Sequence, residues 1–284
     1  MWTAATRWTK REGKVPGHRY FLSIQTVLPD TYREDRVFRD TLRALQQAGY
    51  DGVELNVRDP RTEDPIRLAS FLSDFGLSLS MLATGLAARN NGLSLATIAE
   101  ARRRESVQWT KEALAFASTI GAGVIAGFLK AAAGENTPSH RKQLERSVAE
   151  IAPEAQRRKT PFLVEAINRF ESPLGNSLAE VLELMGGSIN PFLQVLPDTW
   201  HMSIEESHME ASLIRFKDHF SSVHLSDNNR LFPGFGGLDF GKIIGVLDAL
   251  GYSGRLAIEG NLKGSFIEDA RKSADYLRPF LRAD

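Results

Sequence analysis

Short apolar stretches alternate with amphipathic ones along most of the chain. The apolar stretches are six to eight residues long, and several are apolar at nearly every position, as strands buried on both faces should be. We expect a strand in each of these eight stretches. They are residues 20–27, 52–57, 77–84, 123–128, 161–167, 191–196, 221–226 and 255–260.

Amphipathic segments of helical period lie between the predicted strands. In VFRDTLRALQQAGY, the predicted apolar face contains Val37, Leu42, Leu45 and Ala48, and Gly49 marks a C-terminal stop. ESVQWTKEALAFASTIGA and FGKIIGVLDALGYSG show the same periodicity and also run into glycine. The pattern therefore predicts a regular strand–helix repeat.

Eight strand–helix pairs in succession predict a parallel sheet with right-handed crossovers. Eight strands also close a (β/α)8 barrel, and 284 residues suit one such domain. A doubly wound open sheet is the alternative, but the GxGxxG motif that commonly follows its first strand is missing after residue 27. We therefore expect an α/β fold, a single-domain TIM barrel over residues 1–284, with residues 1–18 as an N-terminal extension.

Ionisable residues stand at or near the ends of four consecutive predicted strands. Glu165 ends the fifth strand and Asp198 follows the sixth, with His201 three residues further on. His224 lies in the seventh strand and Glu259 ends the eighth. Any one of them alone is more often a helix cap, an ion pair or a core residue. Because strand ends share one rim of a barrel, where active sites are built, the set predicts a site there.

The residue types in this set favour a metal ion. Three carboxylates close together repel one another, and a divalent cation removes that repulsion. Oxygen ligands with one imidazole favour Mn2+, with Mg2+ and Co2+ as alternatives. The chain has no cysteine, which excludes disulfides, thiolate metal sites and thiol nucleophiles.

Several segments resemble the xylose-isomerase-like TIM-barrel superfamily of sugar isomerases and epimerases. Within it, the likeness is greatest to the ketose 3-epimerase group, which includes enzymes acting on 5-keto-gluconate. The matching segments are GVELNVRDP, ATGLAARNNGLSL, VEAINRFE, PDTWHMSIEE, VHLSDNNRLFPGFGGLDF and IEGN. The chain departs from the family at Ala166 and Ile167, where Pro and Leu are common, and at Gly260, where bulkier residues are common. These departures put the substrate in question more than the chemistry.

The resemblance also implies a role for each candidate residue. The implied metal ligands are Glu165, Asp198, His224 and Glu259. Glu165 and Glu259 would also be the catalytic pair. The residues that hold the sugar oxygens beside the carbonyl would be Glu171, His201 and Arg230.

The expected reaction is metal-dependent epimerisation of a ketose or keto-sugar acid. A proton leaves the carbon beside the carbonyl, a metal-stabilised enediolate forms, and a proton returns to the opposite face, favouring 3-epimerisation. Aldose–ketose isomerisation at the same site is the alternative. Two further alternatives are an AP-endonuclease-like metal-dependent hydrolase and a non-catalytic sugar-binding barrel. The PGFGG segment after the seventh strand lacks the lysine-bearing phosphate-loop pattern and is better explained as a tight turn.

The composition argues against nucleic acid and membrane as partners. Lys plus Arg and Asp plus Glu each number 35, and a dedicated nucleic-acid binder should instead carry a basic excess. No apolar run is long enough to span a bilayer, and the N-terminus lacks the apolar stretch of a signal peptide. We expect a cytoplasmic enzyme that binds a small sugar and neither nucleic acid nor membrane. The resemblance implies a homo-oligomer, either a dimer or a tetramer.

Overall fold

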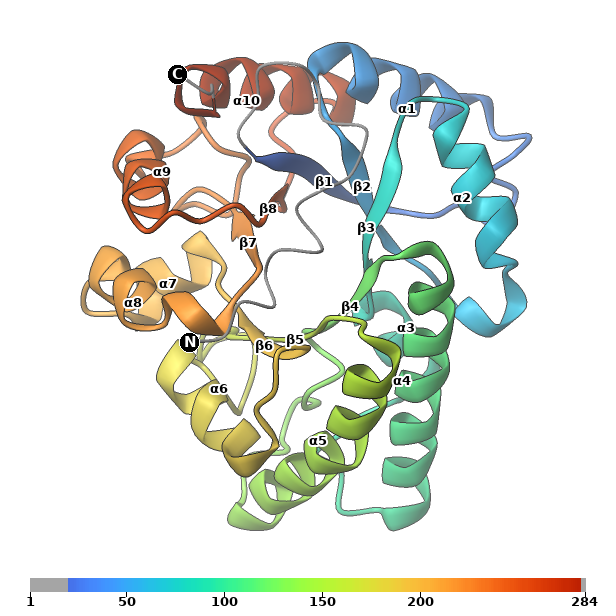
Figure 1. The fold of residues 1–284 in the computed structure, drawn as a ribbon, viewed down its shortest axis with the longest axis vertical. Coiled ribbons are helices and arrows are strands. Elements are labelled where there is room, and N and C mark those ends of the chain that lie inside the picture. The colour runs from blue at the N-terminus through green and yellow to red at the C-terminus, as the bar shows by residue number, and fades with distance from the viewer. Residues whose placement is uncertain (1–19, 282–284) are drawn as a thin grey trace.

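Eight parallel strands surround a central axis, and helices cover their outer faces (Figure 1). The structure is a computed structural model that describes residues 20–281, so the predicted extension over residues 1–18 lies outside the described residues. All eight predicted strands are present. They are β1 (Phe21–Val27), β2 (Gly52–Asn56), β3 (Ser78–Ala83), β4 (Gly123–Ala126), β5 (Phe162–Glu165), β6 (Leu193–Leu196), β7 (Ser222–Leu225) and β8 (Arg255–Ile258).

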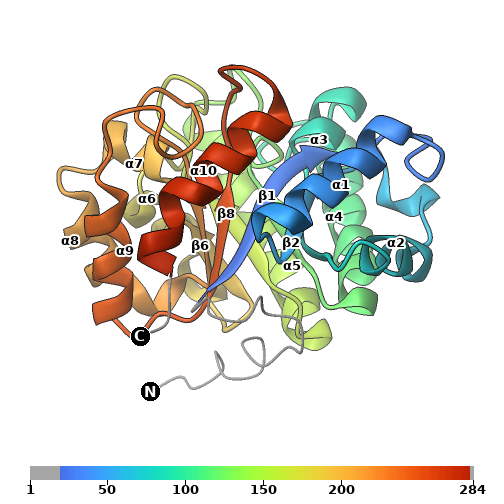
Figure 2. The ribbon, with the colours of Figure 1, turned by 90° about the horizontal axis from the view of Figure 1, so that it is seen from above.

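The helices follow the strands in the predicted alternation. The α-helices are α1 (Arg36–Ala48), α2 (Pro65–Ser73), α3 (Gly85–Asn91), α4 (Glu100–Ile120), α5 (Pro138–Arg158), α6 (Leu178–Met185), α7 (Thr199–Glu205), α8 (Met209–Arg215), α9 (Phe240–Ala249) and α10 (Phe266–Leu281). Short 3-10 turns occur at Pro60–Thr62, Gly186–Ser188 and Lys217–His219. None of the described helices is both long and apolar enough to cross a membrane. The strand arrows point to the top of Figure 2, where α3 and α7 lie, so these two helices flank the rim that carries the strand ends.

The strand order confirms the barrel. It runs β6-β5-β4-β3-β2-β1-β8-β7, so the first and last strands pair and β6 and β7 are the two edges. A parallel bridge between Asp198 and His224 joins these edges, and the backbone N–H of His224 donates to Pro197 O at 2.9 Å. The predicted TIM barrel is therefore correct, and the alternative of an open doubly wound sheet is wrong.

Two apolar layers hold the strands in place. The larger layer lies between the sheet and its helices. A smaller, separate cluster is contributed by four consecutive strands and consists of Met81, Ile125, Leu163 and Leu196. Residues two apart on a strand face the same side, so Glu165 shares the side of Leu163 at the C-terminal end of β5. The strand period thus places a carboxylate above an apolar floor.

Helix α1 shows one error in the predicted apolar face. Asp35 caps its N-terminus by accepting from Phe38 N at 2.9 Å, and Gly49 ends it in the left-handed conformation, with φ 94°. Val37 is 75% exposed, and Phe38 occupies the buried face instead. Position 37 lies about 140° around the helix from Leu42, because each residue turns the helix by about 100°. The prediction that Val37 shares the buried face is therefore wrong.

Two glycines provide a test of the packing around β2. An added Cβ at Gly52 would collide with Ser78 O and with the ring of Phe21, whereas one at Gly245, on an exposed part of α9, would meet nothing within 4 Å. We expect Gly52→Ala to lower the free energy of unfolding by about 1–3 kcal/mol because of overpacking. Gly245→Ala should raise it by about 0.5–1 kcal/mol, because alanine favours the helix. Urea unfolding monitored by circular dichroism measures both, and equal effects would contradict the described contacts of β2.

Candidate active site

Four of the predicted site residues converge at the mouth of the barrel. One ligand atom from each of Glu165, Asp198, His224 and Glu259 lies within 4.8 Å of the others. His224 Nδ1 is 2.7 Å from Glu259 Oε2, 3.4 Å from Glu165 Oε1 and 3.7 Å from Asp198 Oδ2. Glu259 is partly exposed and the other three are buried. We call these four residues the carboxylate–imidazole cluster.

Asp198 also begins a helix. Strand β6 ends at Leu196, and Asp198 is the N-cap of α7. Its Oδ1 accepts from the backbone N–H groups of Trp200 at 2.8 Å and of His201 at 3.1 Å. Because capping occupies Oδ1, Oδ2 is directed to the cluster. The Asp–x–x–His spacing therefore arises from a cap and the first turn of the helix that it caps.

A glycine makes room for Glu165. Gly127 follows β4, and an added Cβ there would lie 2.5 Å from Glu165 Oε2. That separation is shorter than real Cβ contacts, so any side chain at position 127 would displace the carboxylate. The position of Glu165 thus depends on the absence of a side chain directly after the neighbouring strand β4.

Glu54 on β2 is a site residue that the sequence analysis missed. It is fully buried, and its Oε2 lies 2.9 Å from His224 Nε2. When Nε2–H donates to this carboxylate, the Nδ1 lone pair of the neutral imidazole faces the cluster. One signal was available in the sequence, because GVELN places a carboxylate inside an otherwise apolar predicted strand.

The cluster requires positive charge. Burial disfavours the imidazolium form of His224, but the carboxylates of Glu54 and Glu259 outweigh burial and hold its pKa well above the usual value. Burial likewise opposes ionisation of Glu259, yet Arg230 and His224 hold the pKa of that carboxyl well below its usual range. In each case opposite charges nearby outweigh the effect of burial, so the buried acid and the buried base stabilise each other's charged form.

When His224 Nδ1 carries no proton, as in a metal ligand, three buried atoms of the cluster have no hydrogen-bond partner. They are Glu165 Oε1, His224 Nδ1 and Glu259 Oε2. Buried polar atoms without partners are costly, and these three face one another, so a single cation would satisfy all of them. Carboxylate oxygens with one imidazole nitrogen suit a hard or borderline divalent ion. The residues present therefore fit a divalent metal ion.

Arg230 reaches the cluster from the loop after β7. Its Nη1 lies 2.7 Å from Asp198 Oδ2 and its Nη2 lies 3.1 Å from Glu259 Oε1. The guanidinium carbon stands 4.6 Å from the ring centroid of Trp200, which holds its plane. The backbone of Arg230 is left-handed, with φ 62°, an uncommon conformation for a residue with a side chain. The loop thus adopts a strained conformation in the residue that brings its cation to the carboxylates.

His201 also points to the cluster, and its hydrogen bonds indicate its tautomer. Its Nδ1 lies 3.2 Å from the backbone N and 2.8 Å from the side-chain Nδ2 of Asn168, so Nδ1 is the acceptor. The proton of the neutral ring is then on Nε2, which lies 3.9 Å from Glu165 Oε1. His201 can therefore present an N–H donor next to Glu165.

Glu171 is not brought to the cluster. It is exposed on the segment between β5 and α6, and no hydrogen bond or ion pair of the described residues joins its carboxylate to the other candidates. Arg169, two residues earlier, pairs with Glu205 on α7 at 2.5 Å. Glu171 thus lies on the rim, outside the buried cluster.

The PGFGG segment wraps around a buried aspartate. Asp227 Oδ2 accepts from the backbone N–H groups of Gly234 at 3.1 Å and Gly236 at 2.8 Å. Its Oδ1 accepts from Asn228 N at 2.9 Å and Leu238 N at 3.0 Å. These backbone donors already hold a carboxylate of the chain itself, which favours the predicted tight turn over a phosphate site.

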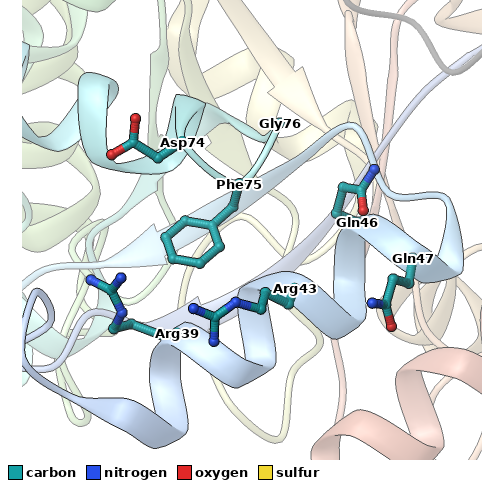
Figure 3. Close-up of a pocket in the computed structure, with 7 residues that line it drawn as sticks. All are labelled: Arg39, Arg43, Gln46, Gln47, Asp74, Phe75 and Gly76. Atoms are coloured by element: carbon teal, nitrogen blue, oxygen red, sulfur yellow. The ribbon is translucent and has the colours of Figure 1, made fainter.

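A surface groove elsewhere on the barrel lacks comparable chemistry. It lies between α1 and the turn before β3, and Arg39, Arg43 and Phe75 are among its lining residues (Figure 3). Both guanidinium groups stand 5.5 Å from the Phe75 ring centroid. Gly76 precedes β3, so the groove lies at the opposite end of the strands from the cluster.

The chain is similar to known sugar epimerases. A profile of the family described as xylose isomerase-like TIM barrel matches residues 42–280, which include the whole cluster. The chain is 33% identical over 225 residues to an L-ribulose 3-epimerase of Mesorhizobium japonicum, covering 77% of this chain and 74% of that protein. It is 28% identical over 231 residues to a probable ketose 3-epimerase of Synechocystis sp., covering 80% of this chain and 78% of that protein.

Solved structures show the same fold. The structure of an L-ribulose 3-epimerase superposes with a TM-score of 0.78 at 23% sequence identity, covering 92% of this chain and 94% of that one. A D-allulose 3-epimerase from Methylomonas sp., solved in complex with D-allulose, also superposes with a TM-score of 0.78. Its sequence identity is 18%, and the match covers 94% of this chain and 98% of that one.

Removal of the Glu54 carboxylate should weaken metal binding. We expect Glu54→Leu to raise the dissociation constant for Mn2+ by about 10–100-fold, because His224 loses the acceptor that orients its ring. Glu54→Gln, which keeps an oxygen acceptor, should have a smaller effect. Asp269→Asn is the matched control, since this buried carboxylate accepts from the N–H groups of Lys263 and Gly264, outside the cluster. Isothermal titration calorimetry measures all four proteins, and unchanged affinity in Glu54→Leu would contradict the assignment.

Proposed function

The chain belongs to the xylose isomerase-like TIM barrel family, and on that premise we propose that it is a divalent-metal-dependent epimerase of a ketose or keto-sugar acid. The observation that carries the proposal is the carboxylate–imidazole cluster, in which two glutamates from β5 and the end of β8 meet one imidazole. The relatives named as ketose 3-epimerases support 3-epimerisation over the other reactions of this chemistry. Aldose–ketose isomerisation at the same site is the alternative outcome.

The cluster would hold the metal ion. Its ligands would be Glu165, Asp198, His224 and Glu259, and Mn2+ is the ion that we propose, with Mg2+ and Co2+ as alternatives. When bound, the ion would supply positive charge beside the substrate carbonyl oxygen, which acidifies the neighbouring C–H bond.

Glu165 and Glu259 would move the protons. Inversion of a carbon centre requires one group to take a proton from one face and another to deliver a proton to the opposite face. The two glutamates belong to strands on either side of β6 and β7, so their carboxylates approach the cluster from different directions. Both lie within 3.4 Å of the same His224 nitrogen, which places them close enough to act on one bound sugar.

Two side chains of the site would orient the substrate. The Nε2–H of His201 faces Glu165 and would donate to a sugar oxygen beside the carbonyl. The guanidinium of Arg230 has N–H groups beyond the two that contact Asp198 and Glu259, and these would bind a second oxygen. Glu171, exposed on the rim, would accept from a sugar hydroxyl that enters beside it.

The dimer or tetramer implied by the family resemblance stays a prediction, as does the cytoplasmic location.

Incubation in D2O tests the reaction directly. We expect the Mn2+-loaded protein to place deuterium at C3 of L-ribulose, D-allulose or D-tagatose and to form the corresponding epimer, because the removed proton exchanges with solvent. Proton NMR locates the label. Label at C1 or C2 would identify an aldose–ketose isomerase. Absence of label from all ketoses and keto-sugar acids tried, with the metal confirmed as bound, would overturn the proposal.

Substitution of the two glutamates tests their assignment. We expect Glu165→Gln and Glu259→Gln each to lower kcat by about 100-fold or more, because the amide cannot exchange a proton. Metal content is measured in parallel, so that loss of the ion and loss of proton transfer are separated. The control is Glu183→Gln, on an exposed part of α6 that does not contact the cluster. Full turnover by either cluster variant would show that the catalytic assignment is wrong.

A further inference from the structure

A buried lysine contacts the backbone of Glu165, and neither of its two hydrogen bonds goes to a carboxylate. Lys130 follows β4 and is 0% exposed. Its Nζ donates to two backbone carbonyl oxygens, Glu165 O at 2.8 Å and Gly175 O at 2.8 Å. Burial of an ammonium group is costly unless its donors are satisfied, so this arrangement requires a structural or functional explanation.

The two carbonyl groups lie at the ends of one segment. Glu165 is the last residue of β5, and Gly175 lies two residues before Ser177, the N-cap of α6. We call residues 166–176 the β5–α6 segment. Two further hydrogen bonds connect the ends of the segment. Ile167 N donates to Gly175 O at 3.3 Å, and Asn176 Nδ2 donates to Ile167 O at 2.6 Å. Lys130 is therefore a cross-link from the turn after β4 to both ends of the segment.

The β5–α6 segment carries groups that the proposed reaction needs. Asn168 donates to His201 Nδ1 and so determines which ring nitrogen bears the proton. Glu171 stands at the exposed part of the segment. Glu165 immediately precedes the segment, and its carbonyl and carboxylate belong to the same residue. A shift of the segment would therefore move a metal ligand, a sugar-binding group and the partner of His201 together.

The contact between Lys130 and Gly175 depends on glycine at position 175. Gly175 is in the left-handed conformation, with φ 65°, and an added Cβ would lie 3.2 Å from Lys130 Nζ and 3.1 Å from Leu184 Cδ1. Glycine allows the backbone to turn its carbonyl to the ammonium without crowding. The four-carbon stem of Lys130 reaches both carbonyl groups from the turn after β4, and its ammonium nitrogen carries three N–H donors.

We propose that Lys130 is a positioning residue of the epimerase, which holds the two ends of the β5–α6 segment so that Glu165, Asn168 and Glu171 face one substrate. Lys130 touches no reacting atom. The proposal rests on the proposed function for its effect on turnover, whereas its effect on the segment is independent of any substrate.

The test compares two buried cations. Lys130→Met removes the ammonium and keeps an unbranched side chain. The matched control is Arg103→Met, because Arg103 is also 0% exposed but pairs with Glu100 and Glu150 on the outer helices. Hydrogen–deuterium exchange of peptides from residues 166–176, Mn2+ affinity and kcat are measured on each full-length protein.

We expect Lys130→Met to speed amide exchange in the β5–α6 segment by about 10-fold, to weaken Mn2+ binding and to lower kcat by about 100-fold, since small misplacements of reacting groups are that costly. Arg103→Met should lower the thermal midpoint without these changes. Wild-type exchange in the segment and wild-type Mn2+ affinity in folded Lys130→Met would overturn the proposal. These two readouts need no substrate, so failure of the proposed function is distinguished from failure of this inference.

A second variant covers the case in which Lys130→Met does not fold. Gly175→Ala keeps the lysine in the chain but brings an added Cβ to 3.2 Å from its Nζ, so the contact between Nζ and Gly175 O must shift. We expect the same pattern of faster exchange confined to the β5–α6 segment. Unchanged exchange there would overturn the positioning role.

Discussion

Repulsion among carboxylates inside the barrel mouth is the constraint on which the rest of the site depends. Two unit charges about 4 Å apart repel by on the order of 4 kcal/mol at the effective dielectric of a protein. Four carboxylates meet around one imidazole here, and they belong to Glu54, Glu165, Asp198 and Glu259. Each neighbouring feature reduces that repulsion. The first turn of α7 donates N–H groups to Asp198, the guanidinium of Arg230 lies between two strand ends, and His224 contacts carboxylates through both ring nitrogens. The remaining uncompensated atoms face the centre, where a divalent cation fits.

The two glutamates assigned to proton transfer have unequal surroundings. Glu259 contacts Arg230 and His224, and these cations hold its pKa well below the usual range, although burial acts in the opposite direction. Glu165 has a glycine backbone against one oxygen and the Nε2 of His201 at 3.9 Å from the other. In the proposed epimerisation, the proton would therefore leave to one glutamate in the forward direction and to a differently surrounded glutamate in the reverse direction. The strands determine where the carboxylates stand, and the loops after β5 and β7 determine what each of them contacts.

The chain itself predicts the parts of this arrangement that follow from local period and from strand order. Alternation of apolar and amphipathic stretches predicted eight strands, and glycine after α1 predicted its end at Gly49. The shared rim of parallel strands predicted that Glu165, Asp198, His224 and Glu259 would meet. Two other contacts between distant segments were beyond such reasoning. Glu54 and His224 are 170 residues apart, and Lys130 is 45 residues from the carbonyl of Gly175, so neither contact leaves a periodic signal. Val37 was misassigned because an apolar residue type does not determine a position on a helix face.

The joint between β6 and β7 links the candidate metal site to the stability of the barrel. Other neighbouring strands are held by ladders of paired residues, including β1 and β8, which come from opposite ends of the described chain. Among the described residues, β6 and β7 are joined by one bridge, between Asp198 and His224, two members of the cluster. A ligand that binds only the folded state stabilises that state in proportion to the logarithm of its concentration. A metal ion at the proposed site would therefore also stabilise the closed barrel, because Asp198 and His224 form this joint. An exchange of either residue would alter the stability of the barrel together with the proposed metal site.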